Sequence, residues 1–596
     1  MRKRALLINP PVYDVQYWAQ WSQPHGLLKV GSYLKQQGYE TRLIDCLYPD
    51  ARGNVPKRIL SVAEFCSMRE TPYSEFRGRQ SRLSPSQRLK FVFGTEPNRP
   101  SDERSRRTLR RELLALAGIA ESATSSGRAL VPSLLQDGVF APDDVWITSI
   151  MTYWWESTVD VAVLCKEVFP LSRVRIGGIY PTLAPDHLRE RLAARGLLFE
   201  IVLGCDLNLD DERDLIVRGE IPPASWLDLD LDLYYEPGVY NSRYYHGPGP
   251  DERGHETAVN DRRYFGPSYA ILTTTRGCPF NCAYCAQRAY NLYDDQRVRR
   301  AVWTQSGRST AVRTRGTAET LREIGDKFER YGIRQFAFYE DNFLVERDHF
   351  QSILEGIVHD PDLRGNVHLH APEGIEVRLM DGSLAKLMRQ AGFERVYLPL
   401  ENINTKVVQS WNRAHSSVQM FERAVRNCVD AGFILRNMQV NAFILFGMPG
   451  EDIRDVVDSV IYASSRVGSV VPMLFTPVPG SALYEEFRDY LQDAKFDLHH
   501  LNGKLLPFLE FNRRRYPELT SQDYLDLEAL MFRLNAQAVR GTFNVGGKGR
   551  VSTSFREIVC LSRSTPNGLV ADTPEAGLQI PPKPSTLPPA TRRALE

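Results

Sequence analysis

Short apolar runs alternate with helical patterns over the first part of the chain. Strands are expected at residues 4–9, 39–45, 145–149, 173–176 and 199–203. Helices are expected at residues 26–37, 158–168 and 185–194. This alternation predicts a doubly wound α/β domain around a parallel sheet, whose ligands bind beyond the carboxyl ends of the strands.

A second alternating series begins at Tyr269. Its six strand-like runs cover residues 270–275, 335–339, 367–370, 395–400, 441–446 and 471–475. Its helical patterns cover residues 317–331, 348–357, 382–390, 417–431 and 452–466. Gly332, Gly392 and Gly432 each stand where a helix should end. In repeated strand–helix units of this kind, chemistry is built at the carboxyl ends of the strands.

The two series suggest how the chain divides. We expect an amino-terminal domain (1–206) with an insertion at about 51–142, a linker (207–267), a second domain (268–482), a helical region (483–563) and a disordered tail (564–596). The insertion is polar and rich in arginine, which fits a solvated basic face or, alternatively, a site for an anionic substrate. The tail is rich in proline, which argues against a packed core there.

Charge and hydropathy limit the partners. Lysine and arginine total 74 against 73 aspartate and glutamate residues, so charge gives no case for nucleic acid. No stretch approaches the roughly 20 apolar residues of a membrane span. The opening MRKRALLINPP has an apolar run too short for a signal peptide, so the cytoplasm is the expected location.

Three of the nine cysteines lie within eight residues, in TRGCPFNCAYCAQR. Thiolates bind zinc or iron–sulfur clusters, and structural zinc usually takes four protein ligands. No fourth cysteine or histidine lies near Cys278, Cys282 and Cys285, so a [4Fe-4S] cluster held here would have one iron without a protein ligand. The alternative is three buried cysteines near a turn, whereas Gly277 and Pro279 indicate an exposed loop. The other six cysteines are scattered and read mostly as buried small residues.

The cysteine spacing, the TRGC run and Tyr284 resemble the signature of radical S-adenosylmethionine (SAM) enzymes. In that family the open iron chelates the amino and carboxylate groups of SAM, and one electron cleaves a C–S bond to give a 5′-deoxyadenosyl radical. The resemblance implies that the second series forms a partial (β/α)6 TIM barrel closed by a carboxyl-terminal helical cap. It also implies an external electron donor such as flavodoxin or ferredoxin.

The strand ends of the second series strengthen the resemblance. Glu340 follows the second strand, Glu401 the fourth, and an FGMPGE turn the fifth. Each alone could be a turn or a helix cap. The resemblance assigns SAM binding to Tyr284, Glu340, Glu401, Gly447, Pro449 and Gly450.

Four side chains of the second series are candidates for catalysis. His368 and His370 are two residues apart on a strand, so they share one face and could bind substrate or move a proton. Tyr397 could relay a hydrogen atom, and Glu340 is a candidate acid. The alternative for the histidines and the tyrosine is packing within the core.

The strand ends of the first series resemble the cobalamin-binding domain that precedes many radical SAM cores. Asp45, Ser149 and the Gly177-Gly178 pair fall in register with that family's Asp-x-His-x-x-Gly, Ser-x-Leu and Gly-Gly motifs. Leu47 stands at the position of the cobalt-ligating histidine and Asp50 at the motif glycine, so no histidine of this motif can bind cobalt. The resemblance assigns cobalamin binding to Pro10, Pro11, Ser149, Met151, Gly177, Gly178 and Thr182. The alternative is a Rossmann-like domain without cofactor that serves as a lid or a substrate platform.

The combined resemblance implies methyl transfer from cobalamin to an unreactive carbon of a small-molecule or peptide substrate. Two alternatives remain open. The first is a radical rearrangement, cyclisation or oxidation without methyl transfer. The second is a non-catalytic iron–sulfur electron-transfer or scaffold protein.

Overall fold

The computed structural model describes residues 2–10, 12–13, 23–46, 57–58, 109–111, 113–114, 116, 140–204, 212–220, 226–234, 269–306, 312–413, 416–520, 523–524, 527, 530–531 and 534–535. Pro11, Leu47, Asp50, most of the insertion and the tail at 564–596 lie outside these residues.

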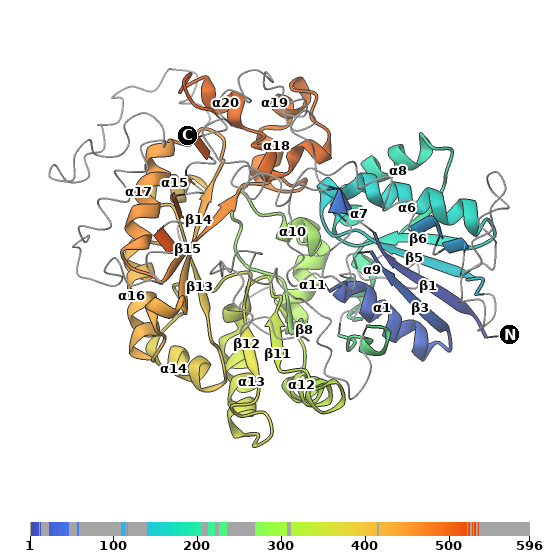
Figure 1. Ribbon diagram of the computed structural model, residues 1–596, viewed down its shortest axis with the longest axis horizontal. Coiled ribbons are helices and arrows are strands. Elements are labelled where there is room, and N and C mark those ends of the chain that lie inside the picture. The colour runs from blue at the N-terminus through green and yellow to red at the C-terminus, as the bar shows by residue number, and fades with distance from the viewer. Residues whose placement is uncertain are drawn as a thin grey trace, which may run out of the picture.

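The amino-terminal domain is a five-stranded parallel sheet with helices on both faces. Its strands are β1 (Arg4–Asn9), β3 (Glu40–Asp45), β5 (Asp144–Thr148), β6 (Arg173–Gly177) and β7 (Glu200–Ile201). Its helices are α1 (His25–Gln36), α6 (Trp155–Val168), α7 (Ile179–Leu183) and α8 (Pro185–Ala193). The strand order β3-β1-β5-β6-β7 confirms the predicted doubly wound sheet (Figure 1, right).

Alternate residues of β1 enter different cores, as a central strand requires. Ala5 and Leu7 pack with Leu27 and Leu34 of α1, whereas Leu6 and Ile8 belong to the core on the opposite face. The strand order reverses between β1 and β5, which is where an open α/β sheet binds its ligand.

The second domain contains all six predicted strands. β8 (Tyr269–Leu272), β11 (Gln335–Phe338) and β12 (His368–His370) form one parallel sheet; β13 (Val396–Glu401), β14 (Val440–Phe446) and β15 (Ser469–Leu474) form another. The Leu369–Phe393 bridge, and a hydrogen bond from the Ile375 amide to the Tyr397 carbonyl, connect the two. Strand number and order match the prediction, and closure into a partial barrel stays a prediction.

Five helices follow these strands in the predicted places. They are α12 (Thr317–Tyr331), α13 (Arg347–His359), α14 (Gly382–Gln390), α16 (Val418–Asp430) and α17 (Ile453–Ser464). Gly332 ends α12 in the left-handed conformation at φ 67°, which glycine adopts without a steric penalty.

Several elements were not expected from the sequence. The first expected strand stops at Leu272, and β9 (Thr275–Arg276) pairs with β10 (Arg313–Thr314) instead. α9 (Glu212–Arg218) and η5 (Leu231–Leu233) lie in the stretch expected to be a linker, and α9 packs on α11 (Gln296–Ser306) through Ile216, Val298 and Val302. The remaining short elements are β2 (Val12–Tyr13), β4 (Lys57–Arg58), η4 (Thr152–Trp154), α10 (Gln287–Tyr290), η7 (Phe343–Glu346), α15 (Thr405–Ser410) and η8 (Leu435–Asn437).

The chain after β15 is helical, as predicted. It forms α18 (Ala482–Glu486), α19 (Arg488–Asp493), η9 (Leu498–Leu501), η10 (Gly503–Leu505) and α20 (Leu509–Arg513). Further on, Leu527, Leu530, Met531 and Leu534 are helical and buried in the core of the second domain. Within the described residues, no helix combines the length and apolar character needed to cross a membrane.

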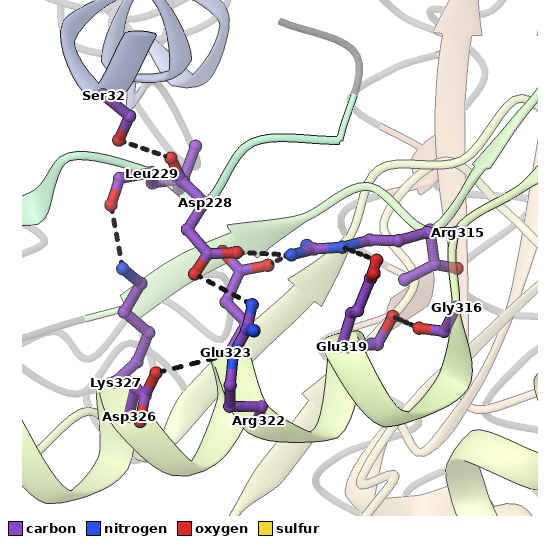
Figure 2. Close-up of polar contacts among 12 residues, drawn as sticks. Ser32, Asp228, Leu229, Arg315, Gly316, Glu319, Arg322, Glu323, Asp326 and Lys327 are labelled. Atoms are coloured by element: carbon purple, nitrogen blue, oxygen red, sulfur yellow. Dashed lines mark hydrogen bonds and ion pairs between the residues drawn. The ribbon is translucent and has the colours of Figure 1, made fainter. Parts of the chain in front are cut away.

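Residues 226–234 form a strap between the two domains (Figure 2). The Ser32 hydroxyl of α1 donates to the Asp228 carbonyl at 2.8 Å, and the Lys327 ammonium of α12 donates to the Leu229 carbonyl at 2.8 Å. The buried Arg315 guanidinium bridges the carboxylates of Asp228 and Glu323. These bonds fix the strap to α1 on one side and to α12 on the other.

A second junction joins the amino-terminal domain to the carboxyl-terminal helices. His187 Nε2 lies 2.7 Å from Asp497 Oδ1, and the Arg191 guanidinium donates to Asp497 Oδ2 at 2.6 Å. Burial raises the Asp497 pKa, but the contacts with His187 and Arg191 help to lower it to about 2. The strap and this junction attach the amino-terminal domain at two separate places.

Candidate functional site

The cysteine loop follows β9 and is anchored at several points. The Gly277 amide donates to Asp341 Oδ2, after β11, at 2.7 Å. The Ala283 amide donates to the Trp411 carbonyl at 2.8 Å, and the Asn412 side chain donates to the Asn281 carbonyl at 2.7 Å. Residues after β11 and after α15 (Thr405–Ser410) therefore fix the loop backbone.

The three cysteines of this loop are free thiols. Burial raises the pKa of Cys278 to about 12 and that of Cys285 to about 11. Cys285 is nonetheless exposed to solvent. Binding iron would remove the thiol protons and offset this burial cost.

A single metal ion and an iron–sulfur cluster require different arrangements of their ligands. Among the described residues, no three histidine, cysteine, aspartate or glutamate side chains lie close enough to hold one metal ion. A [4Fe-4S] cluster places each thiolate on a different iron, which spreads its ligands further apart. As a donor set, the three thiols of this one loop suit an iron–sulfur cluster, and their role as its ligands stays a prediction.

Glu401 stands at the centre of a buried polar group next to this loop. The Tyr284 hydroxyl donates to Glu401 Oε1 at 3.2 Å, and an Arg413 guanidinium nitrogen lies 3.6 Å from the same oxygen. Burial raises the Glu401 pKa, and Arg413 opposes the shift. Glu401 also has φ 61° at a bulge of β13, a conformation uncommon for residues other than glycine and frequent at functional sites.

Glu340 makes three short hydrogen bonds inside the domain. Its Oε1 accepts from the Thr274 amide at 2.5 Å, and its Oε2 accepts from the Thr275 amide and hydroxyl at 2.7 and 2.6 Å. Burial raises its pKa, and these bonds oppose the shift. The observed contacts make Glu340 a brace for the segment that leads into the cysteine loop. Its predicted roles in SAM binding and catalysis stay predictions.

The FGMPGE turn is held from within and from the carboxyl-terminal helices. Gly447 has φ 81° and Gly450 φ 74°, so both positions favour glycine. Glu451 accepts hydrogen bonds from the Gly447 amide at 2.9 Å and from the Tyr524 hydroxyl at 2.7 Å. The turn that carries Gly447, Pro449 and Gly450 is therefore rigid, and its contact with SAM stays a prediction.

Glu451 gives the protein a pH-dependent stability. Burial raises its pKa from 4.5 to about 7, so the folded state holds a proton that the unfolded state releases above pH 4.5. The unfolding free energy should therefore fall as pH rises from about 4.5 to about 7, by on the order of 1–3 kcal/mol. Urea unfolding of wild type and Glu451→Gln at pH 5 and pH 7.5 tests this, because the variant should lack this part of the decline. Equal declines in the two proteins would contradict it.

The two candidate histidines contact residues at the starts of other strands. His370 Nε2 lies 2.6 Å from Gln335 Oε1 at the start of β11, and burial lowers its pKa to about 3. His368 Nδ1 lies 2.7 Å from Glu394 Oε1, just before β13. These partners belong to the amino ends of the strands, whereas chemistry is expected at the carboxyl ends. Tyr397 stacks on Phe443 with ring centroids 5.4 Å apart. The geometry favours structural roles for all three, and their catalytic roles stay predictions.

The predicted cobalamin motifs converge on one edge of the amino-terminal sheet. Gly178 has φ 111°, and a Cβ placed there would lie 2.4 Å from the Ser149 carbonyl oxygen, so only glycine fits. The Ser149 hydroxyl accepts from Thr158 at 2.9 Å, and the Thr182 hydroxyl donates to the Gly178 carbonyl at 2.7 Å. Gly177 continues β6 into this turn, and Pro10 is buried after β1. Pro11 lies outside the described residues.

This edge of the sheet lies at the switch point, next to the second domain. The apolar side chain of Met151 is 39% exposed at the end of β5, next to the switch point between β1 and β5. Behind it, α7 packs against α10, the helix that follows the cysteine loop. One continuous apolar core joins Ile176 of β6 with Leu445 and Phe475 of the second domain. Binding of a corrinoid at this edge stays a prediction.

Comparison with known families assigns the second domain. Residues 272–463 match the radical SAM superfamily. This segment is a radical SAM domain. It contains the cysteine loop, Glu340, Glu401 and the FGMPGE turn, which the sequence had suggested for this superfamily.

Individual relatives are distant. The chain is 22% identical over 341 residues to bacteriochlorophyllide d C-12(1)-methyltransferase of Chlorobaculum tepidum, covering 55% of this chain and 63% of that protein. It is 22% identical over 292 residues to cytidylyl-2-hydroxyethylphosphonate methyltransferase of Streptomyces wedmorensis, covering 48% and 46%. The chain thus spans between about half and two thirds of the length of these curated relatives.

A solved structure is also similar. It is TsrM, a radical SAM methyltransferase from Kitasatospora setae with cobalamin and a [4Fe-4S] cluster bound. The identity is 17% and the TM-score 0.46, over 82% of this chain and 75% of that one.

Arg413 and Asp341 belong to the site but were not singled out from the sequence. Asp341 follows Glu340 in a run of polar residues after β11, and such a run at a strand end is the pattern that could have identified it. Arg413 lies 131 residues from Cys282, and only the fold shows that the two meet.

Proposed function

We propose that the protein is a cobalamin-dependent radical SAM enzyme that methylates an unreactive carbon of a small-molecule or peptide substrate. The observation that carries the proposal is the packing of α7 against α10. It sets the carboxyl edge of the amino-terminal sheet against the cysteine loop of a radical SAM domain. The names of the relatives support it, since both are methyltransferases.

The protein's own residues prepare the site for these groups. Cys278, Cys282 and Cys285 would hold the cluster, and Tyr284, Arg413 and the strained backbone at Glu401 fix the Glu401 carboxylate next to the cysteine loop. The apolar core shared by the domains keeps water from the junction. When bound, the cluster supplies the electron that cleaves SAM, and cobalamin supplies the methyl group.

The electron comes from outside the chain in this proposal. A cytoplasmic flavodoxin or ferredoxin would provide it, and the reducing cytoplasm would protect the cluster.

Product analysis separates methylation from the other radical reactions. We expect reconstituted protein, given SAM, hydroxocobalamin, reductant and a metabolite extract of the source cells, to form S-adenosylhomocysteine and 5′-deoxyadenosine in about equal amounts. The reason is that each methylation consumes one SAM as methyl donor and one as radical source. Chromatography of the quenched reaction measures both products. 5′-Deoxyadenosine alone would instead support rearrangement, cyclisation or oxidation, and absence of both would favour a non-catalytic iron–sulfur protein.

A further inference from the structure

Arg413 lies against one cysteine of the loop. Its guanidinium Nη1 donates to Cys282 Sγ at 3.6 Å, within hydrogen-bonding distance for sulfur. A second guanidinium nitrogen lies 3.6 Å from Glu401 Oε1. The Arg413 side chain is 12% exposed, so its charge acts with little screening by water.

The backbone holds this guanidinium in place. Asn412 has φ 54°, and the Arg413 amide closes the turn by donating to the Val408 carbonyl at 3.1 Å. The Trp411 carbonyl and the Asn412 side chain both bind the backbone of the cysteine loop. The segment that carries Arg413 is therefore fixed to the loop that carries Cys282.

The charges around Cys282 oppose one another. The Arg413 guanidinium lies 3.6 Å from both Cys282 Sγ and Glu401 Oε1, so the Glu401 carboxylate offsets part of the positive charge that Arg413 presents to the sulfur. The reduction potential of an iron–sulfur cluster depends on net charge and on hydrogen bonds to the sulfurs. A fixed cation at one thiolate favours the reduced, more negative cluster, and a nearby carboxylate disfavours it.

We propose that Arg413 is a positioning residue that raises the reduction potential of the cluster through its hydrogen bond to Cys282, with Glu401 acting in the opposite direction. Arg413 would thus make the cluster easier for a biological donor to reduce. The inference rests on the proposed cluster at Cys278, Cys282 and Cys285.

The test is a redox titration followed by electron paramagnetic resonance, without SAM, corrinoid or substrate. At the wild-type midpoint potential, we expect Arg413→Gln to show at least a tenfold lower ratio of reduced to oxidised cluster, which is 59 mV for one electron. Arg413→Lys keeps the charge and should stay within about threefold of wild type. Glu401→Gln should shift the ratio upward.

Matched controls separate tuning from damage. Arg389 lies on α14, and its guanidinium donates to the Phe393 carbonyl at 3.2 Å. The variant Arg389→Gln should leave the midpoint potential of the cluster unchanged. If Arg413 had a purely structural role, Arg413→Gln would contain less iron, and the midpoint potentials of Arg413→Gln and Glu401→Gln would not shift in opposite directions. Equal midpoint potentials in wild type, Arg413→Gln and Glu401→Gln would overturn the inference.

Two further outcomes are decisive. If Arg413→Gln takes up no iron, then Glu401→Gln decides, and a midpoint potential in Glu401→Gln equal to that of wild type would overturn the inference. If wild type itself holds no cluster, the proposed function fails first, and this result is distinct from a cluster whose potential does not move.

Discussion

Replacing Cys282 with alanine should abolish reductive cleavage of SAM. A ligand loss exceeds the 10- to 100-fold cost typical of losing an outer-shell partner, so we expect more than ~100-fold less 5′-deoxyadenosine. Cys282 is buried and contacts Arg413. Cys278 and Cys285 are the other two described cysteines of the loop, so none is left to replace Cys282. Iron content and 5′-deoxyadenosine formation after anaerobic reconstitution measure the effect.

Cys428 supplies the control for this variant. It is a free, fully buried cysteine on α16, outside the loop. Cys428→Ala should keep its iron and its activity. An active Cys282→Ala protein with four irons per chain would show that the cluster is held elsewhere.

Replacing Arg315 with leucine should cost ~3–5 kcal/mol of unfolding free energy. The side chains of Arg315 and Glu323 are both 3% exposed, and Arg315 also binds Asp228 of the strap (Figure 2). Removing the guanidinium would leave the Glu323 carboxylate buried without its partner. Urea unfolding monitored by circular dichroism measures the loss.

Two matched variants show whether the buried charge is the cause. Arg322 contacts the same Asp228 at 3.6 Å, but its side chain is 57% exposed, so Arg322→Gln should cost less than ~1 kcal/mol. The double variant Arg315→Leu/Glu323→Leu removes the stranded carboxylate and should recover part of the loss. A cost below ~1 kcal/mol for Arg315→Leu would contradict the role of this ion pair.

Elements with a strong local signal could be predicted from the sequence. The helix at 317–331 was predicted to the residue, because a regular apolar face ends at Gly332 and the left-handed backbone there stops the helix. The positions of the strands along the chain followed from their alternation with helices. α11 was missed because the apolar residues of QRVRRAVWTQS that pack, Val298 and Val302, do so against Ile216 of α9, far away in sequence.

Candidate site residues could be named from the sequence only where they share a local motif. The cysteine spacing identified the loop, and the strand ends identified Glu401 and the FGMPGE turn. The partners of Glu340 are mainly backbone amides, which leave no mark in the sequence, so its bracing contacts could not be foreseen. The contacts of His370 with Gln335 and of Arg413 with Cys282 likewise depend on the register between distant segments.

Metal and corrinoid content tests the central claim most directly. The protein would be purified without oxygen in the presence of hydroxocobalamin, reconstituted with iron and sulfide, and compared with Cys282→Ala. The two-cofactor account predicts about four irons and about one corrinoid per wild-type chain, with the iron lost from the variant. Four irons without corrinoid would contradict the cobalamin-dependent function, and absence of iron from wild type would contradict the cluster itself.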